Sequence, residues 1–120
     1  MPSDDDNVRL RHMLDYSREA IHMAEGQRRG DLDTHRMLQL SLVRLVEIVG
    51  EAASRVSAPT RQQYPQIPWP QIAGMRNRLV HGYDFVDYDI LWQTVSEDLP
   101  ALVAALEPLV SGPPGREPGP

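Results

Sequence analysis

Apolar residues along this chain recur mainly at the three- and four-residue spacing of one helix face. The first such run predicts a helix that Asp5, Asp6 or Asn7 caps and that Gly26 ends. Its apolar positions are Leu10, Met13, Leu14, Ile21 and Ala24. A second helix is predicted over about 33–56. No strand pattern competes with these helices.

The second predicted helix is apolar around more than one face, so it requires two packing partners. Its apolar residues are Met37, Leu38, Leu40, Leu42, Val43, Leu45, Val46, Ile48 and Val49. One face can pack within the subunit while the other contacts a second subunit. A central helix surrounded by its own bundle would show the same pattern, so both alternatives stay open.

Prolines change the pattern in the middle of the chain. The residues concerned are Pro59, Pro65, Pro68 and Pro70. They exclude a regular helix between 57 and 70 and predict an ordered, extended connection in which Tyr64 and Trp69 are the anchors.

Pro70 suits the first turn of a third helix. Ile72, Met75 and Leu79 would share its buried face, and Gly82 would end it. This arrangement places His81 at the C-terminus of a helix.

The last helical region is expected to begin at a cap formed by Asp84 or Asp87 and to be kinked or divided at Pro100. Its apolar positions are Ile90, Leu91, Val95, Leu99, Leu102, Val103, Leu106 and Val110. Taken together, the pattern predicts an all-α bundle of four to five helices.

The 120 residues contain no cysteine and suffice for one domain with its own core. The expected organisation is an acidic tail at 1–6, a helical domain at 7–110 and a disordered tail rich in proline and glycine at 111–120. The chain has neither an apolar run of membrane-spanning length nor the features of a signal peptide, so we expect a cytoplasmic protein without a membrane partner.

The formal net charge of −5 argues against a uniformly basic surface that would bind nucleic acid. Only 6% of the residues are aromatic, which disfavours a platform for stacking bases. Any contact with RNA must therefore be local. The pair Arg28 and Arg29 is one candidate for an auxiliary contact.

One segment concentrates the candidate chemistry, and it reads Arg76-Asn77-Arg78-Leu79-Val80-His81-Gly82-Tyr83. The guanidinium of Arg76 can bind two phosphate oxygens, and His81 can accept or donate a proton near neutral pH. Taken singly, Arg76 could be an ion-paired surface arginine and His81 a histidine that caps the helix C-terminus.

The spacing of Arg76 and His81 predicts an incomplete site in one chain. On an ideal helix their side chains lie about 7.5 Å apart along the axis and about 140° apart around it, so they share a face only if the helix loosens near Gly82. Cleavage of RNA by its own 2′-OH needs a base and an acid, and one chain offers a single well-placed histidine. A symmetric dimer would supply two of each residue in one cleft.

Other chemistry lacks its residues in this sequence. The four histidines, His12, His22, His35 and His81, show no metal-ligand spacing, and no cysteine assists them, so we expect neither a metal site nor a cofactor. No phosphate-binding glycine loop or nucleophile elbow is present. Glu51 is an outside candidate for a polar member of the site, because a solvated helix glutamate is the commoner case.

A series of landmarks in the chain resembles the HepT-like toxins of the HEPN superfamily. They are Glu47-Ile48-Val49-Gly50-Glu51-Ala52-Ala53, Pro68-Trp69, the Arg76–Tyr83 segment preceded by Met75, Trp92 and Asp98-Leu99-Pro100. The resemblance implies a dimeric HEPN bundle that acts as a metal-independent endoribonuclease, the toxin of a type VII toxin–antitoxin pair.

Specific roles follow from that resemblance. Arg76 and His81 match the catalytic pair, and Asn77 matches the polar residue that follows the arginine. Tyr83 matches the tyrosine to which the antitoxin, a nucleotidyltransferase of the MntA type, attaches AMP. The homodimer could assemble further with this antitoxin.

Two other classes of function compete with the toxin. A non-catalytic HEPN module could bind nucleotide or substrate for a partner nucleotidyltransferase without cutting RNA. A purely structural helical dimer would leave the Arg-Asn and His-Gly-Tyr residues unexplained. The sequence does not indicate whether tRNA or mRNA is the target.

Overall fold

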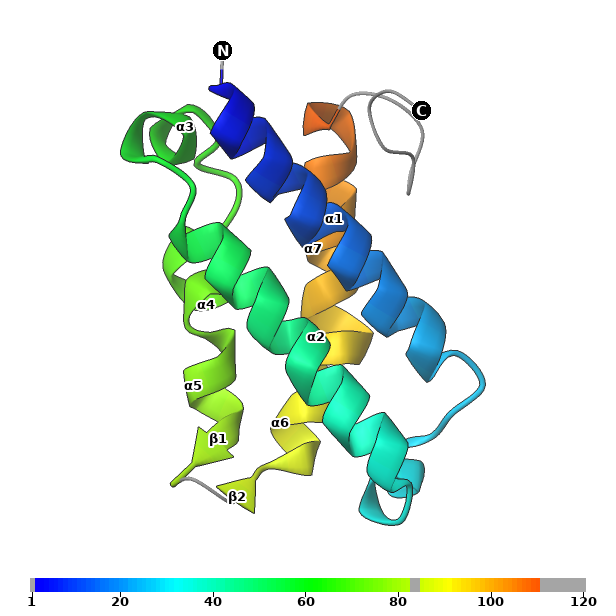
Figure 1. Ribbon diagram of the computed structural model, residues 1–120. Helices are drawn as coiled ribbons and strands as arrows, with labels where there is room; N and C mark the ends of the chain where they lie inside the picture. The colour runs from blue at the N-terminus through cyan, green and yellow to red at the C-terminus, as the bar shows by residue number, and fades with distance from the viewer. Residues whose placement is uncertain (1, 83–84, 111–120) are drawn as a thin grey trace.

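Two long antiparallel helices organise the computed structural model, which describes residues 2–82 and 85–110 (Figure 1). These are α1 (Asp4–Ala24) and α2 (Arg36–Ser54). The other α-helices and the two strands are α3 (Ala58–Gln63), α4 (Trp69–Ala73), α5 (Met75–Leu79), β1 (Val80–His81), β2 (Phe85–Val86), α6 (Tyr88–Gln93) and α7 (Leu99–Leu106). Short 3-10 helices lie at Arg29–Asp33 and Glu107–Leu109. The all-α prediction is confirmed. If α4–α5 and α6–α7 each count as one divided rod, the described part has five helical units.

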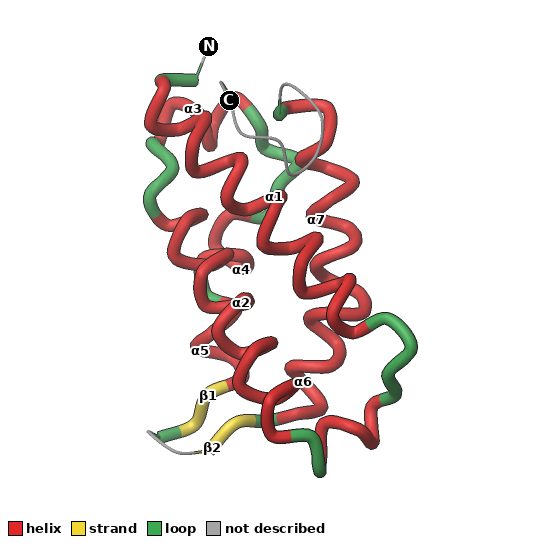
Figure 2. Tube along the Cα trace, turned by 45° about the vertical axis from the view of Figure 1, so that its right-hand side comes forward, coloured by secondary structure: helices red, strands yellow, loops and turns green. Residues whose placement is uncertain are grey.

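The core lies between the α1–α2 pair and the shorter helices, which cover one side of this pair (Figure 1). The rod α6–α7 packs against α1, while α4 and α5 pack against α2 (Figure 2). Fully buried side chains from these elements include Leu10, Met13, Leu42, Val46, Met75, Leu79, Leu91, Leu99 and Leu106. Burial of each large apolar side chain contributes about 1.5–3 kcal/mol, so this interior holds the short α5 in place. Within the described ranges no helix is both long and apolar enough to cross a membrane.

The first helix begins earlier than the sequence pattern predicted. Its N-cap is Ser3, whose Oγ accepts a hydrogen bond from the Asp6 amide at 3.1 Å. The predicted caps Asp5, Asp6 and Asn7 all lie inside the helix, and the predicted tail at 1–6 is therefore wrong from Asp4 onward. Carboxylates in a first helical turn interact favourably with the helix dipole, which explains why an acidic run can be helical.

Asp6 is also a buried connection between two helices. Its carboxylate accepts hydrogen bonds from the backbone amide of Ser57 at 3.0 Å, from the Ser57 hydroxyl, and from Thr60 Oγ1 at 2.6 Å. Burial would raise the pKa of Asp6, but these hydrogen bonds, helped by the charge of Arg9, hold its pKa below the ordinary value of 3.8. The start of α1 is thereby tied to the start of α3.

Asp6→Ala should lower the free energy of unfolding at pH 7 by about 2–4 kcal/mol, because the buried Thr60 hydroxyl and the hydroxyl and amide of Ser57 lose a charged acceptor. Because the folded-state pKa is depressed, the stabilisation is complete above the unfolded-state pKa and is lost as the pH falls through the folded-state pKa. The stability gap between wild type and Asp6→Asn should therefore shrink in urea titrations taken from pH 5 downward. A gap that stays constant with pH, or an equal loss in the exposed control Asp4→Asn, would contradict this role.

The proline-rich connection contains more helix than expected. Residues 58–63 form α3, so the predicted absence of a regular helix is wrong there. Pro59 lies in the first turn of α3, where its missing N–H removes no intrahelical hydrogen bond. Pro70 likewise lies in the first turn of a helix, α4, as predicted. Trp69 is buried and donates through Nε1 to the Tyr64 carbonyl at 3.0 Å, which confirms the anchor.

One face of α2 is largely uncovered within the described residues. Met37 is 74% exposed and Leu40 is 54% exposed. Arg44, Glu47 and Glu51 continue the same face at helical spacing. A central helix buried entirely by its own bundle, one of the two alternatives, is therefore not what the chain forms.

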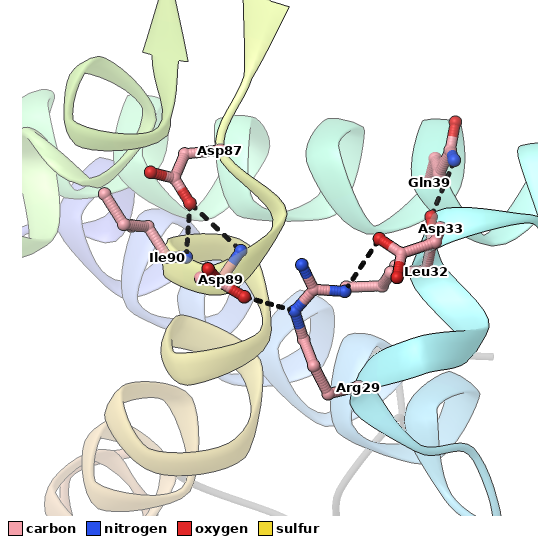
Figure 3. A network of polar contacts seen from close by, with 7 residues as sticks. All are labelled: Arg29, Leu32, Asp33, Gln39, Asp87, Asp89 and Ile90. Carbon is pink, nitrogen blue, oxygen red and sulfur yellow. Dashed lines mark hydrogen bonds and ion pairs between the residues drawn. The ribbon is translucent and has the colours of Figure 1, made fainter.

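A polar network fixes the turn between α1 and α2 against the start of α6 (Figure 3). Arg29 donates to Asp33 Oδ1 at 3.0 Å and to Asp89 Oδ1 at 2.6 Å. These hydrogen bonds raise the pKa of the Arg29 guanidinium, and the bond to Asp33 has the larger effect. Gln39 Nε2 donates to the Leu32 carbonyl at 2.6 Å. The structure thus engages Arg29 in a structural role, whereas its neighbour Arg28 has an exposed side chain.

The last rod is divided as predicted. Asp87 caps α6, since its Oδ1 accepts from the amides of Asp89 at 3.0 Å and Ile90 at 3.1 Å. A π-helical turn at Thr94–Asp98 follows, and Pro100 occupies the first turn of α7. Proline has no N–H for the regular ladder, and a widened turn just before it accommodates the ring. The predicted tail at 111–120 lies outside the described residues.

Candidate functional site

The segment that carries Arg76 and His81 leaves the helix after Leu79. Val80 is extended and pairs with Val86, while His81 pairs with Phe85. The prediction that His81 lies at a helix C-terminus is therefore wrong, and no helix dipole acts on it directly. The cause is non-local: the Asp87 amide donates to the Leu79 carbonyl at 2.7 Å, and a two-residue ladder replaces the next helical turn.

Gly82 makes the reversal after β1 possible. Its φ of 69° lies in the left-handed region that residues with a Cβ seldom adopt. The helix thus loosens before Gly82, as a common site for Arg76 and His81 would require. Tyr83 follows directly and lies outside the described residues.

Arg76 projects from α5 toward α2. Its Nε donates to Glu47 Oε2 at 3.0 Å, and its side chain is 50% exposed. Both Nη groups have no hydrogen-bond partner among residues 2–82 and 85–110. The outer edge of the guanidinium, which matches two phosphate oxygens, therefore remains available.

His81 is exposed on the β1–β2 ladder. Its ring centroid lies 5.8 Å from that of Phe85, which is itself 61% exposed. In the part of the chain that the structure describes, the His81 ring makes no hydrogen bond. A C-capping role, the structural alternative for this histidine, is excluded by its position in a strand.

Asn77 and Arg78 share α5 with Arg76 but differ in their surroundings. Asn77 is exposed, and its side chain has no hydrogen bond within the described ranges. Arg78 is 45% exposed and pairs with Asp98 at 3.5 Å. Arg78 thus forms its surface ion pair on another side of the helix from the Arg76–Glu47 pair.

A cleft of about 690 Å³ separates the N-terminal half of α1 from α2. It is lined by Asp5, Val8, Arg9, His12, Arg44, Glu47, Ile48, Glu51, Ala52, Arg55 and Arg76. Arg76 lines this cleft, whereas neither Asn77 nor His81 is among its lining residues. In Figure 1 β1 follows the C-terminal end of α5. In the described part of one subunit the α1–α2 cleft therefore contains Arg76 without His81.

Sequence reasoning missed the contribution of α2 to the surroundings of Arg76. Glu47 accepts from Arg76 and also from Arg44 Nη1 at 2.8 Å. Glu51, the outside candidate, lines the same cleft and pairs with Arg55 at 2.9 Å. The i,i+3 spacing of Arg44 and Glu47 is visible in the sequence, but nothing local indicates that Arg76 joins them.

The sequence of this chain is similar to those of known proteins. A family model described as "Ribonuclease HepT-like" matches residues 13–109, a range that contains Arg76 and His81. A Methanocaldococcus jannaschii protein named "Putative RNase" is 28% identical over 98% of this chain and 97% of its own length. A "Putative RNase" of Caldanaerobacter subterraneus is 34% identical over 78% of this chain and 83% of its own. The "Probable ribonuclease HepT" of Thermococcus cleftensis is 41% identical over 59% and 64%, respectively. No solved structure matches the chain.

Proposed function

Because the chain belongs to the HepT-like ribonuclease family of the HEPN superfamily, we propose that it is a metal-independent endoribonuclease whose active site forms between two subunits. Two observations on one short segment support this most directly. The outer edge of the Arg76 guanidinium is unoccupied by described residues, and the His81 ring is exposed and makes no hydrogen bond with them. Both groups have the chemistry for phosphodiester cleavage: the ion pair of Arg76 with Glu47 uses Nε and leaves both Nη groups, and the His81 ring makes no hydrogen bond within the described residues.

The reaction follows from these two side chains. One His81 removes the proton from a ribose 2′-OH, and the 2′-oxygen forms a bond to phosphorus. The bond from phosphorus to the 5′-oxygen breaks, and a second His81 protonates that oxygen. Arg76 stabilises the negative charge on the pentacoordinate phosphorus. The products are a 2′,3′-cyclic phosphate and a 5′-hydroxyl.

A homodimer supplies the second histidine. Exposed apolar side chains that a partner subunit could cover include Met37, Leu40 and Phe85. Phe85 lies against His81, so an interface formed there would bring the two His81 side chains close to each other. A twofold axis near the β1–β2 ladder would also place two Arg76 side chains around one cleft.

The test is cleavage of total RNA by the purified wild type in EDTA, with analysis of the new ends. We expect metal-free cleavage that produces 2′,3′-cyclic phosphate. The control is the same protein with magnesium added, which should not raise the rate. If the folded protein binds RNA but leaves it intact, the function is the non-catalytic binding module instead.

We further propose that the protein is the toxin of a toxin–antitoxin pair and that Tyr83 is its site of inhibition. Tyr83 lies two residues after His81, so an attached AMP would bring negative charge to the catalytic segment and compete with RNA phosphate for Arg76. Inhibition of this kind needs no refolding.

Incubation with ATP and an MntA-type nucleotidyltransferase should add AMP mass to the wild type and stop RNA cleavage. Intact-protein mass spectrometry would measure the addition. Tyr83→Phe should gain no mass, and Tyr88→Phe, which alters a half-buried tyrosine of α6, should behave as the wild type. Equal addition to Tyr83→Phe and wild type would remove Tyr83 from the proposal.

A further inference from the structure

Glu47 joins two arginines that come from different elements. Its Oε2 accepts from Arg76 Nε at 3.0 Å, and its Oε1 accepts from Arg44 Nη1 at 2.8 Å. Two guanidinium groups on one carboxylate leave a net positive charge at this point of the cleft. The Glu47 side chain is 33% exposed, so the group of three lies at the surface where a ligand can reach it.

The contacts leave both arginines able to bind an anion. Arg76 uses Nε for Glu47, which leaves its two Nη groups for a phosphate. Arg44 uses one Nη group and is 68% exposed. Because Glu47 binds both, it holds the two cations next to each other, as adjacent phosphates of an RNA strand would require.

The cleft beside these arginines has the size and lining of a nucleotide subsite. Its volume of about 690 Å³ lies within the range common for ligand sites. Val8, Ile48 and Ala52 provide apolar wall. The polar lining beside the Arg44–Glu47–Arg76 group consists of Asp5, Arg9 and His12 from α1 and the Glu51–Arg55 ion pair from α2, so that the four arginines of the cleft outnumber its three carboxylates. The cleft is lined by Arg76, the N-terminal half of α1 and the C-terminal half of α2, and neither residue of β1 lines it.

We propose that the α1–α2 cleft binds the RNA strand next to the cleaved phosphodiester. Arg44 contacts the neighbouring phosphate, and Glu47 is a positioning residue that aligns Arg44 with Arg76. This inference rests on the proposed ribonuclease function, because the strand is identified through the phosphate that Arg76 would bind. It assigns Arg44 and Glu47 roles in strand binding that the 76–83 segment does not contain.

The first test is binding of a fluorescent 2′-O-methyl RNA, which lacks the attacking hydroxyl and cannot be cleaved. Arg44→Ala should weaken its affinity about fivefold to tenfold and lower the slope of log affinity against log salt by about 0.7. The matched control is Arg78→Ala, which also removes an exposed, ion-paired arginine but lies outside this cleft. If Arg44→Ala binds as Arg78→Ala does, the subsite is disproved.

The second test separates positioning by Glu47 from a structural contribution. In Glu47→Gln we expect kcat for RNA cleavage to fall about tenfold, since the shared charged acceptor for Arg76 is lost. Affinity for the 2′-O-methyl RNA should not fall, because a negative charge has left the cleft. An unchanged kcat, or a parallel loss of RNA affinity and thermal stability, would overturn the positioning role.

The subsite proposal and the ribonuclease proposal would be contradicted by different results. If the wild type cleaves RNA but Arg44→Ala binds and cleaves normally, the subsite is wrong while the ribonuclease stands. If the wild type cleaves nothing yet Arg44→Ala selectively weakens binding, the cleft binds RNA while the ribonuclease proposal is wrong.

Discussion

Replacing His81 with alanine should lower the rate of RNA cleavage by a factor of about 10²–10⁴. The proposed mechanism uses this side chain both to take the proton from the 2′-OH and to protonate the departing 5′-oxygen. The His81 side chain is exposed and makes no hydrogen bond within the described residues, so its removal should leave the fold intact. Single-turnover cleavage of a defined RNA measures the rate, and a thermal melt checks the fold.

The matched control is His22→Ala. His22 is also an exposed histidine, but it lies near the end of α1 and pairs with Glu25 at 3.3 Å. Its removal should not alter cleavage. A small effect of His81→Ala, comparable with that of His22→Ala, would mean that another group carries the proton.

Mixed dimers test whether two His81 side chains act together. If wild-type and His81→Ala subunits exchange freely at equal amounts, about a quarter of the dimers keep both histidines. The mixture should then retain about a quarter of the activity of an all-wild-type sample. Retention of about half would indicate that each subunit works alone.

The parts of the fold that depend on local spacing could be predicted from the sequence. Ile72, Met75 and Leu79 are buried on one side of α4–α5, as their spacing indicated. Asp87 caps α6, and Pro100 begins α7, because capping and proline rules act over a few residues. Periodicity needs no knowledge of distant partners.

Features that depend on distant partners could not be predicted. The helix ends at Leu79 because residues 85–87 form backbone hydrogen bonds and strand pairs with residues 79–81. Asp6 is buried because Ser57 and Thr60, which follow it by 51 and 54 positions, donate hydrogen bonds to its carboxylate. The sequence placed Asp6 in a solvated tail for lack of any sign of these hydroxyls. A polar residue is correctly located only when its partners are known.

The candidate site shows the same division between local and distant information. Arg76 and His81 could be selected by residue type and spacing. The Glu47–Arg76 pair joins residues 29 positions apart, so the α1–α2 cleft was not foreseen. The contact with Glu47 also distinguishes the surroundings of Arg76 from those of Arg78, although the two arginines look equivalent in the sequence.

Arg76→Ala should lower kcat by about 10²–10³, the loss typical when one donor to a transition-state oxyanion is removed. Its ion pair with Glu47 lies at the surface and contributes at most about 1 kcal/mol, so the variant should remain folded. Kinetics with a defined RNA in EDTA would measure the loss against Arg78→Ala. That control has nearly the same exposure and its own carboxylate partner, yet it should keep wild-type activity.

Arg76→Lys separates charge from geometry at the same position. A lysine keeps the positive charge but cannot offer two parallel N–H groups to a phosphate or use an Nε–H toward Glu47. We therefore expect Arg76→Lys to bind 2′-O-methyl RNA almost as the wild type does while cleaving about as slowly as Arg76→Ala. Full activity in Arg76→Lys would show that position 76 contributes charge alone. Normal activity in Arg76→Ala would remove the guanidinium of Arg76 from the mechanism. Another cation would then have to stabilise the phosphorane, and Arg44, which shares the acceptor Glu47 with Arg76, would be the candidate.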